Sequence, residues 1–139
     1  MVIFIPCCKQ KRSRACKARD LYSSNLFQKQ LEFALKEVGE GSVFILSAKH
    51  GIVGLDDILE PYEEILIPKN SERWGGMVVD QARERKLDLV TAVYYVSSRY
   101  FQPLEKILDT ELNCPFRHFS IFDRRHFFFK GDQTQQELF

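Results

Sequence analysis

Short apolar runs alternate with amphipathic segments along most of the chain. Four runs rich in β-branched and aromatic residues, at 2–5, 42–46, 89–96 and 119–122, have the length and composition of buried strands. Between them, three segments place apolar residues at helical spacing and predict helices. This alternating order predicts a single α/β domain over residues 1–139, a three-layer sandwich around a mainly parallel sheet of four or more strands.

Start and stop signals mark the predicted helices. The first helix has Ser23 or Ser24 as its N-cap and ends at the glycines of segment 39–41. The second runs from about residue 70 to residue 86, and the third begins near Pro103. Segment 51–68 predicts a long packed loop, and no element is assigned after residue 123.

Each of the first three apolar runs ends abruptly in residues that can do chemistry. Segment 7–11 reads Cys-Cys-Lys-Gln-Lys, segment 47–51 reads Ser-Ala-Lys-His-Gly, and segment 97–100 reads Ser-Ser-Arg-Tyr. The carboxyl ends of parallel strands share one edge of a sheet, and ligands bind in the crevice there. We therefore expect Cys7, Ser47 and Ser97 to lie on one edge of one sheet, beside a common ligand site.

Composition and charge narrow the classes of protein to consider. No apolar run approaches the roughly 20 residues that span a bilayer, and basic residues follow the first run instead of preceding it as in a signal peptide. We therefore expect a cytoplasmic protein with reduced cysteines and no membrane partner. The formal net charge is only +1, yet six cations and no acid occupy residues 9–19. This basic loop favours a local anion site, for a nucleotide or a short single-stranded stretch of nucleic acid, over coating of a duplex.

Cys7 is the candidate nucleophile. It precedes Lys9 and Lys11, and neighbouring cations favour the reactive thiolate. The alternative is a small buried side chain at a strand end. Cys7, Cys8 and Cys16 lack the C-x2-C spacing of a zinc site, and the chain has no glycine-rich loop of the P-loop or dinucleotide type. We therefore expect neither a metal ion nor a cofactor.

Segment 47–51 combines small residues with two functional side chains. Gly51 permits the positive φ that a sharp exit from a strand requires. Lys49 offers a point charge for phosphate, and His50 can exchange a proton near neutral pH. Structural hydrogen bonding is the alternative role for His50.

Two further segments place polar residues at a predicted helix start, where free amide groups attract anions. Tyr22 and Ser24 precede the first helix, and a simple N-cap is the alternative role for Ser24. Ser97, Arg99 and Tyr100 precede the third helix. Arg99 can hold a phosphate or carboxylate, and Tyr100 can stack on a base.

Several motifs that occur in order resemble a family of small bacterial and phage domains of unknown function. They are P-C-x3-K at 6–11, A-R-D-L-Y-x-S-x-L-F at 18–27, I-L-S-A-K-H-G-I-V at 45–53, L-D at 55–56, P-Y at 61–62 and R-Y-x-x-P-L at 99–104. Segment 47–62 is also similar to the peroxide-stress protein of the YaaA type, whose relatives are linked to DNA binding. The P-C-x3-K string resembles that of the archaeosine synthases, which remodel a deazaguanine base of tRNA. In those enzymes a tyrosine and a serine follow at once, whereas here Tyr22 and Ser24 come later.

The resemblance implies a site for a nucleotide or nucleobase. From this resemblance and the strand-end pattern, we select four candidate catalytic residues: Cys7, Ser47, His50 and Asp56. The candidates for binding substrate or phosphate are Lys11, Tyr22, Ser24, Lys49, Gly51, Tyr62, Ser97, Arg99 and Tyr100. The leading hypothesis is an enzyme that modifies a nucleobase or acts on its glycosyl bond.

Two other functions are compatible with the same residues. The basic loop 9–19 fits a non-catalytic module that binds nucleic acid or protects against stress, and such a module predicts strongly salt-dependent binding. Cys7, Cys8 and Cys16 fit redox or metal chemistry.

Overall fold

The computed structural model describes residues 1–137, and the side chains of residues 1–130. At its centre is a four-stranded sheet with the order β4-β3-β1-β6. Strands β1 (Ile3–Pro6), β3 (Val43–Ser47) and β6 (Val93–Tyr94) run parallel, and β4 (Gly51–Gly54) is antiparallel to β3. The prediction of an α/β fold with a mainly parallel sheet is confirmed.

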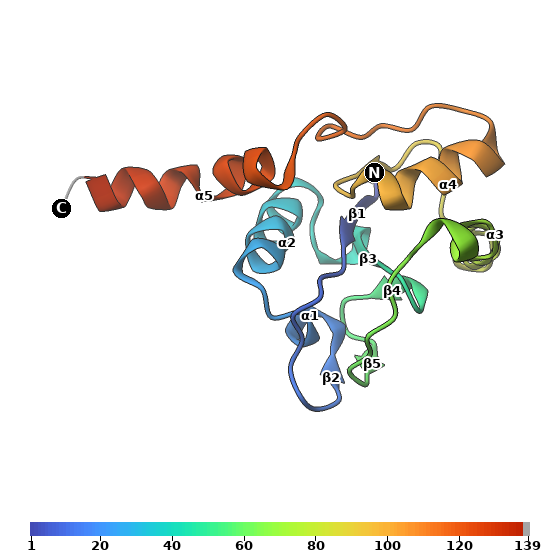
Figure 1. Cartoon of the computed structure of the whole chain (residues 1–139), viewed down its shortest axis with the longest axis horizontal. Coiled ribbons are helices and arrows are strands. Elements are labelled where there is room, and N and C mark those ends of the chain that lie inside the picture. Colours follow the sequence, from blue (N-terminus) through green and yellow to red (C-terminus); the bar gives the residue numbers. More distant parts are fainter. Residues whose placement is uncertain (138–139) are drawn as a thin grey trace.

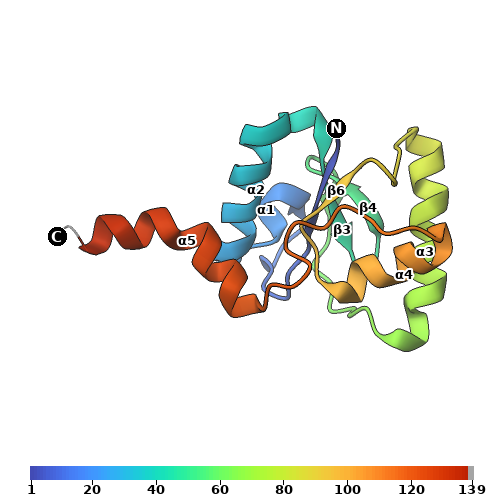
Figure 2. The same cartoon turned by 90° about the horizontal axis from the view of Figure 1, so that it is seen from above.

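Helices cover both faces of this sheet, as Figure 2 shows, so the domain has three layers. Helix α2 (Asn25–Val38) packs on one face, and α3 (Pro68–Arg85) and α4 (Ser98–Leu108) pack on the other. Alternation along β1 supplies both cores, because Ile3 and Ile5 face α2 whereas Phe4 faces α3 and α4.

Helix α2 begins and ends where the sequence predicts. The Ser24 Oγ accepts a hydrogen bond from the Phe27 amide at 3.1 Å, and Gly39 ends the helix with a φ of 83°. In α3, Gly75 allows close packing on α4, since a Cβ there would lie 2.6 Å from the Cδ1 of Ile107.

Other boundaries differ from the prediction. Segment 51–68 is not an irregular loop throughout, because it contains β4 and β5 (Ile58–Leu59). The basic loop contains β2 (Cys16–Lys17), which pairs with β5, and the short helix α1 (Ala18–Leu21). A single 3₁₀ turn, η1 (Glu40–Ser42), leads into β3. Helix α4 starts five residues before Pro103, which lies inside it, and the strand predicted at 89–96 is only Val93–Tyr94.

The strand predicted at 119–122 is wrong, because the chain there enters helix α5 (Ile121–Glu137). The Ser120 Oγ accepts a hydrogen bond from the Asp123 amide at 3.0 Å, and the Asp123 Oδ2 accepts one from the Ser120 amide at 3.1 Å. This reciprocal pair is a capping box, which starts a helix. Helix α5 packs against α2 through contacts such as Phe33 with Phe127, and its far end extends away from the sheet (Figure 1).

Candidate functional site

The three strand endings predicted to meet lie on one edge of the sheet. The Cys7 amide donates a hydrogen bond to the Leu46 carbonyl at 3.1 Å, so Cys7 leaves β1 beside Ser47 at the end of β3. On the other side of β1, β6 leads into Ser97, which lines the same pocket as Cys7. The parallel register of the sheet therefore assembles this site from segments far apart in sequence.

Cys7 contacts the side chain of Tyr100. The Cys7 Sγ lies 3.3 Å from the Tyr100 hydroxyl oxygen, and the edge of the Trp74 indole packs against the Tyr100 ring with 5.6 Å between centroids. Burial, followed by the nearby Cys7 sulfur, raises the pKa of Tyr100 above its ordinary value. Tyr100 is therefore a neutral phenol at neutral pH and can donate a hydrogen bond to the sulfur.

Cys7 borders a pocket of about 550 Å³ that we call the basic pocket. Its lining residues are Cys7, Cys8, Lys9, Lys11, Tyr62, Glu63, Glu64, Ile65, Arg99 and Tyr100. Three of these are cations, and the Lys11 Nζ lies 4.4 Å from the centroid of the Tyr62 ring. The pocket thus brings together the predicted residues Cys7, Lys11, Tyr62, Arg99 and Tyr100, and adds Lys9.

Tyr62 is the centre of a buried chain of hydroxyl groups. Its hydroxyl oxygen lies 2.5 Å from that of Tyr22 and 2.6 Å from the Ser47 Oγ. The same Ser47 Oγ accepts hydrogen bonds from the amides of Lys49 and His50 at 3.2 and 3.0 Å. Burial raises the pKa of Tyr22 to about 12. Tyr22 and Ser47 have no exposed surface, so neither faces the solvent. Their role is structural, because the hydroxyl chain and the Ser47 bonds to the two amides hold the turn after β3 in place.

His50 lies at the edge of this hydroxyl chain. The rings of His50 and Tyr62 form a T-shaped pair with 5.2 Å between their centroids. The His50 carbonyl accepts a hydrogen bond from the Gln81 Nε2 at 2.8 Å. Burial, and then the charge of Lys49, lower the pKa of His50 below 6.5. Gly51 has the positive φ that the sequence predicts, 72°, and a Cβ there would lie 2.2 Å from the Gln81 Oε1. Tyr62 lines the basic pocket, whereas its neighbour His50 and the adjacent Gly51 do not.

Two predicted site residues have other partners. Asp56 is exposed and pairs with Arg19 at 3.0 Å and Lys17 at 3.8 Å, away from the basic pocket. Lys49 lies at the rim, where its Nζ is 3.6 Å from a Glu64 carboxylate oxygen. The structure thus leaves Asp56 outside the group of residues that it gathers around Cys7.

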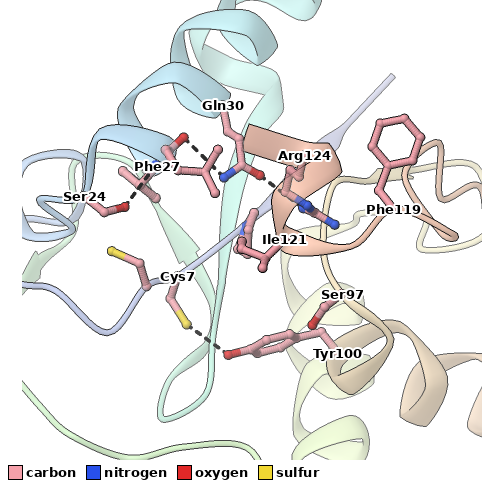
Figure 3. Close-up of a pocket in the computed structure, with 12 residues that line it drawn as sticks. Cys7, Ser24, Phe27, Gln30, Ser97, Tyr100, Phe119, Ile121 and Arg124 are labelled. Atoms are coloured by element: carbon pink, nitrogen blue, oxygen red, sulfur yellow. Dashed lines mark hydrogen bonds between the residues drawn. The ribbon is translucent and has the colours of Figure 1, made fainter. Parts of the chain in front are cut away.

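A second pocket, of about 300 Å³, shares Cys7, Cys8 and Tyr100 with the basic pocket, and Figure 3 shows its lining. We call it the arginine pocket, because Arg124 reaches it from α5. The predicted residues Ser24 and Ser97 line it together with Cys7 and Tyr100. Sequence reasoning missed Arg124, since its position depends on how α5 packs against α2, and no local pattern marks it.

Comparison with known proteins identifies the family of this chain. A family model covers residues 2–128, from before the first strand into α5. The chain belongs to DUF6884, a family of unknown function. The DUF6884 match includes all the residues named above for both pockets. No curated protein and no solved structure matches the chain.

Two further observations on this DUF6884 domain concern metal sites and membrane-spanning helices. Within the described residues, no three His, Cys, Asp or Glu side chains are grouped so that they could hold a metal ion. In the same part of the chain, no helix combines the length and the apolar character needed to cross a membrane. The functional groups that line the basic pocket with Cys7 are thiol, phenol, ammonium, guanidinium and, from Glu63 and Glu64, carboxylate groups.

Proposed function

We propose that this DUF6884 domain is an enzyme that acts on the base of a nucleotide, free or within nucleic acid, with Cys7 as its nucleophile. The observation that carries the proposal is the position of Cys7 at one wall of a pocket that also presents Lys9, Lys11 and Arg99. Glu63 and Glu64 line the same pocket, so cations outnumber carboxylates there by three to two. Cations near a thiol favour the reactive thiolate. The resemblance of segment 6–11 to the archaeosine synthases supports a base as the reacting group.

In this proposal, the cations of the basic pocket bind the phosphate of the nucleotide and an aromatic ring binds its base. Lys11 and Arg99 hold the phosphate, with Lys9 adjacent to them, and Lys49 adds charge at the rim. Tyr100 is half-buried and offers its ring to the base. Tyr62 is too buried to stack on a ligand, so its role is to position Lys11 above its own ring.

The chemical step is an addition by the thiol. The Cys7 Sγ forms a bond to an electrophilic carbon of the base, and the π electron pair of that carbon moves to the neighbouring nitrogen. The thiol proton ends on that nitrogen, so the addition needs no further reactant. The neutral Tyr100 hydroxyl donates a hydrogen bond to the thiolate that exists after the proton has left and before the S–C bond is complete.

A panel of nucleoside monophosphates carrying the five common bases tests the proposal. Binding is measured by calorimetry, and the covalent adduct on Cys7 by mass spectrometry of the intact protein. Cys7→Ser should bind as the wild type does and form no adduct, whereas Lys11→Gln should bind at least several-fold more weakly. Lys17→Gln is the matched control, since Lys17 lies in the same loop but pairs with Asp56. An adduct that still forms in Cys7→Ser, or none in the wild type, would contradict Cys7 as the nucleophile, and lack of binding by the whole panel would contradict a nucleotide as the ligand.

A second function, a non-catalytic nucleic-acid-binding module, is favoured by the exposed cations that lie outside the basic pocket. Arg12 and Arg14 are both exposed, and among the described residues the Arg12 Nε donates to the Asp20 carbonyl, at 2.9 Å. Such a module would bind single-stranded DNA with a steep salt dependence, and each cation lost would lower the slope by about one unit. Binding that depends on Arg12 and Arg14 but not on Cys7 or Lys11 would favour this function over the enzyme.

A further inference from the structure

Arg124 is a buried cation without an anionic partner in the described part of the chain. Its side chain lines the arginine pocket, and the residue is only 6% exposed. Among the described residues, its side-chain hydrogen bonds come from Nη1, which donates to the Gln30 Oε1 at 3.2 Å and to the Tyr95 carbonyl. Both acceptors are neutral, and among the described residues no carboxylate lies within ion-pair distance of the guanidinium. A buried charge with neutral partners alone is costly, so an anion that reached it would be bound strongly.

The remaining donors of Arg124 are available to a ligand. Its Nε and Nη2 have no hydrogen-bond partner among the described residues, and neither is fully enclosed by protein. Figure 3 shows Arg124 near Gln30, with Ser97 and Tyr100 across the pocket. Burial lowers the pKa of Arg124, which is the direction expected when no anion compensates its charge.

Two helix N-termini add positive potential to the same pocket. Helix α2 contributes its N-cap Ser24, and helix α4 contributes its N-cap Ser97. The Ser97 side chain makes no capping hydrogen bond, and the Tyr100 amide donates to the Ser97 carbonyl at 3.0 Å. The amides of Ser98 and Arg99 have no partner among the described residues and are free for a ligand. A cation and two helix dipoles therefore act on one pocket.

We propose that the arginine pocket is an oxyanion-binding subsite, in which Arg124 and the α4 N-terminus bind a phosphate or carboxylate group next to Cys7. The other walls are apolar and include Pro6, Phe27 and Ile121, so the subsite suits a small anionic group on an apolar body. Anion binding here stands independently. A role of this subsite in holding a second reactant for Cys7 rests on the proposed function, in which Cys7 reacts with a base in the basic pocket. Cys7 borders both pockets, so an anionic group bound at Arg124 would lie next to the same thiol.

Titration with inorganic phosphate, acetate and chloride at constant ionic strength tests this subsite. The two readouts are the melting temperature and the NMR signals of the Arg124 Nε–H group and the Ser97 amide. Phosphate or acetate, but not chloride, should give saturable shifts at both signals, and whichever of the two binds more tightly identifies the preferred class. Arg124→Gln should weaken binding at least tenfold. Arg125→Gln is the matched control, because Arg125 is exposed on the next position of α5.

Variants of the basic pocket separate this subsite from the proposed function. Arg99→Gln and Lys11→Gln should keep the anion effect at Arg124 while they weaken nucleotide binding. The opposite result would be an anion-dependent rise in melting temperature that is lost in Arg99→Gln and Lys11→Gln but kept in Arg124→Gln. It would place the anion in the basic pocket, and it would overturn the subsite proposal without contradicting the proposed function. Lack of any saturable shift at Arg124 Nε–H in the wild type would also overturn it, and this measurement does not depend on whether Arg124→Gln folds.

Discussion

The Cys7 Sγ and the Tyr100 hydroxyl oxygen lie 3.3 Å apart although 93 positions separate them in the chain. Strand β1 delivers Cys7 and the neighbouring strand β6 leads into α4, whose first turn carries Tyr100. The pair forms a shared wall between the basic pocket and the arginine pocket. A ligand in either pocket would therefore meet the same sulfur.

Removal of the Tyr100 hydroxyl should slow the reaction of Cys7 with electrophiles. We expect Tyr100→Phe to lower the rate of Cys7 alkylation by iodoacetamide about two- to tenfold at neutral pH, because a hydrogen bond that stabilises the thiolate is worth roughly 1 kcal/mol. The ring and its packing against Trp74 remain. Mass spectrometry of each cysteine measures the rates, with Cys16 as the internal control. An unchanged or faster rate at Cys7 would show that the hydroxyl does not assist the thiolate.

Tyr62 should contribute more to stability than a tyrosine with a single hydrogen bond. Tyr62→Phe deprives both Tyr22 and Ser47 of a buried partner, so we expect the free energy of unfolding in urea to fall by about 2–3 kcal/mol. Tyr94→Phe is the comparison, since within the described residues the Tyr94 hydroxyl has one hydrogen bond, which it donates to the Leu89 carbonyl. An equal or smaller loss in Tyr62→Phe would contradict the central place of Tyr62 in the hydroxyl chain.

Alkaline pH should destabilise the fold through Tyr22. Its pKa is raised from 10 to about 12 by burial, so the unfolded chain loses this proton before the folded one does. The stability linked to Tyr22 is complete below pH 10 and falls by roughly 1.4 kcal/mol per pH unit until the folded pKa is reached. Urea unfolding between pH 9 and pH 12 measures the slope. In Tyr22→Phe the slope should be shallower by that amount, and an identical slope would refute the assignment.

The charge on Lys49 should control part of the titration of His50. Burial comes first and the Lys49 charge second in lowering the pKa of His50, so Lys49→Gln should move the midpoint upward toward 6.5 without reaching it. Because the pKa is lowered in the folded state, the stability linked to His50 is present above pH 6.5 and is lost as the pH falls below it. NMR titration of the imidazole measures the midpoint, with Lys36→Gln on α2 as a control. A midpoint that stays fixed in Lys49→Gln would show that the lysine charge does not reach the ring.

The parts of the fold that the sequence predicts well are those with strong local signals. Most residues of the apolar runs that became β1 and β3 are buried, and α2 has both an N-cap at Ser24 and a glycine at its end. Within the site, the same logic located Cys7, Ser47 and Ser97, since parallel strands bring their carboxyl ends to one edge.

Long-range packing decided the parts that local patterns could not predict. Segment 119–122 is a short apolar run, which suits a strand or a buried helix equally, and the Ser120–Asp123 spacing was the available signal for a helix. Strand β4 forms because Ser47 caps the turn that reverses the chain, a hydrogen-bond pattern that composition does not reveal. Arg124 becomes part of a pocket only when α5 packs on α2, so its role follows from tertiary structure alone.

Mapping a bound nucleotide by NMR tests the proposed function most directly. Each of the five nucleoside monophosphates is titrated into the wild-type chain, and the amide shifts are assigned along the sequence. We expect at least one nucleotide to give saturable shifts centred on Cys7, Lys11 and Tyr100, and these shifts should weaken in Lys11→Gln and persist in Lys17→Gln. Saturable shifts confined to segment 12–19, or none from any nucleotide, would contradict a nucleotide site at Cys7.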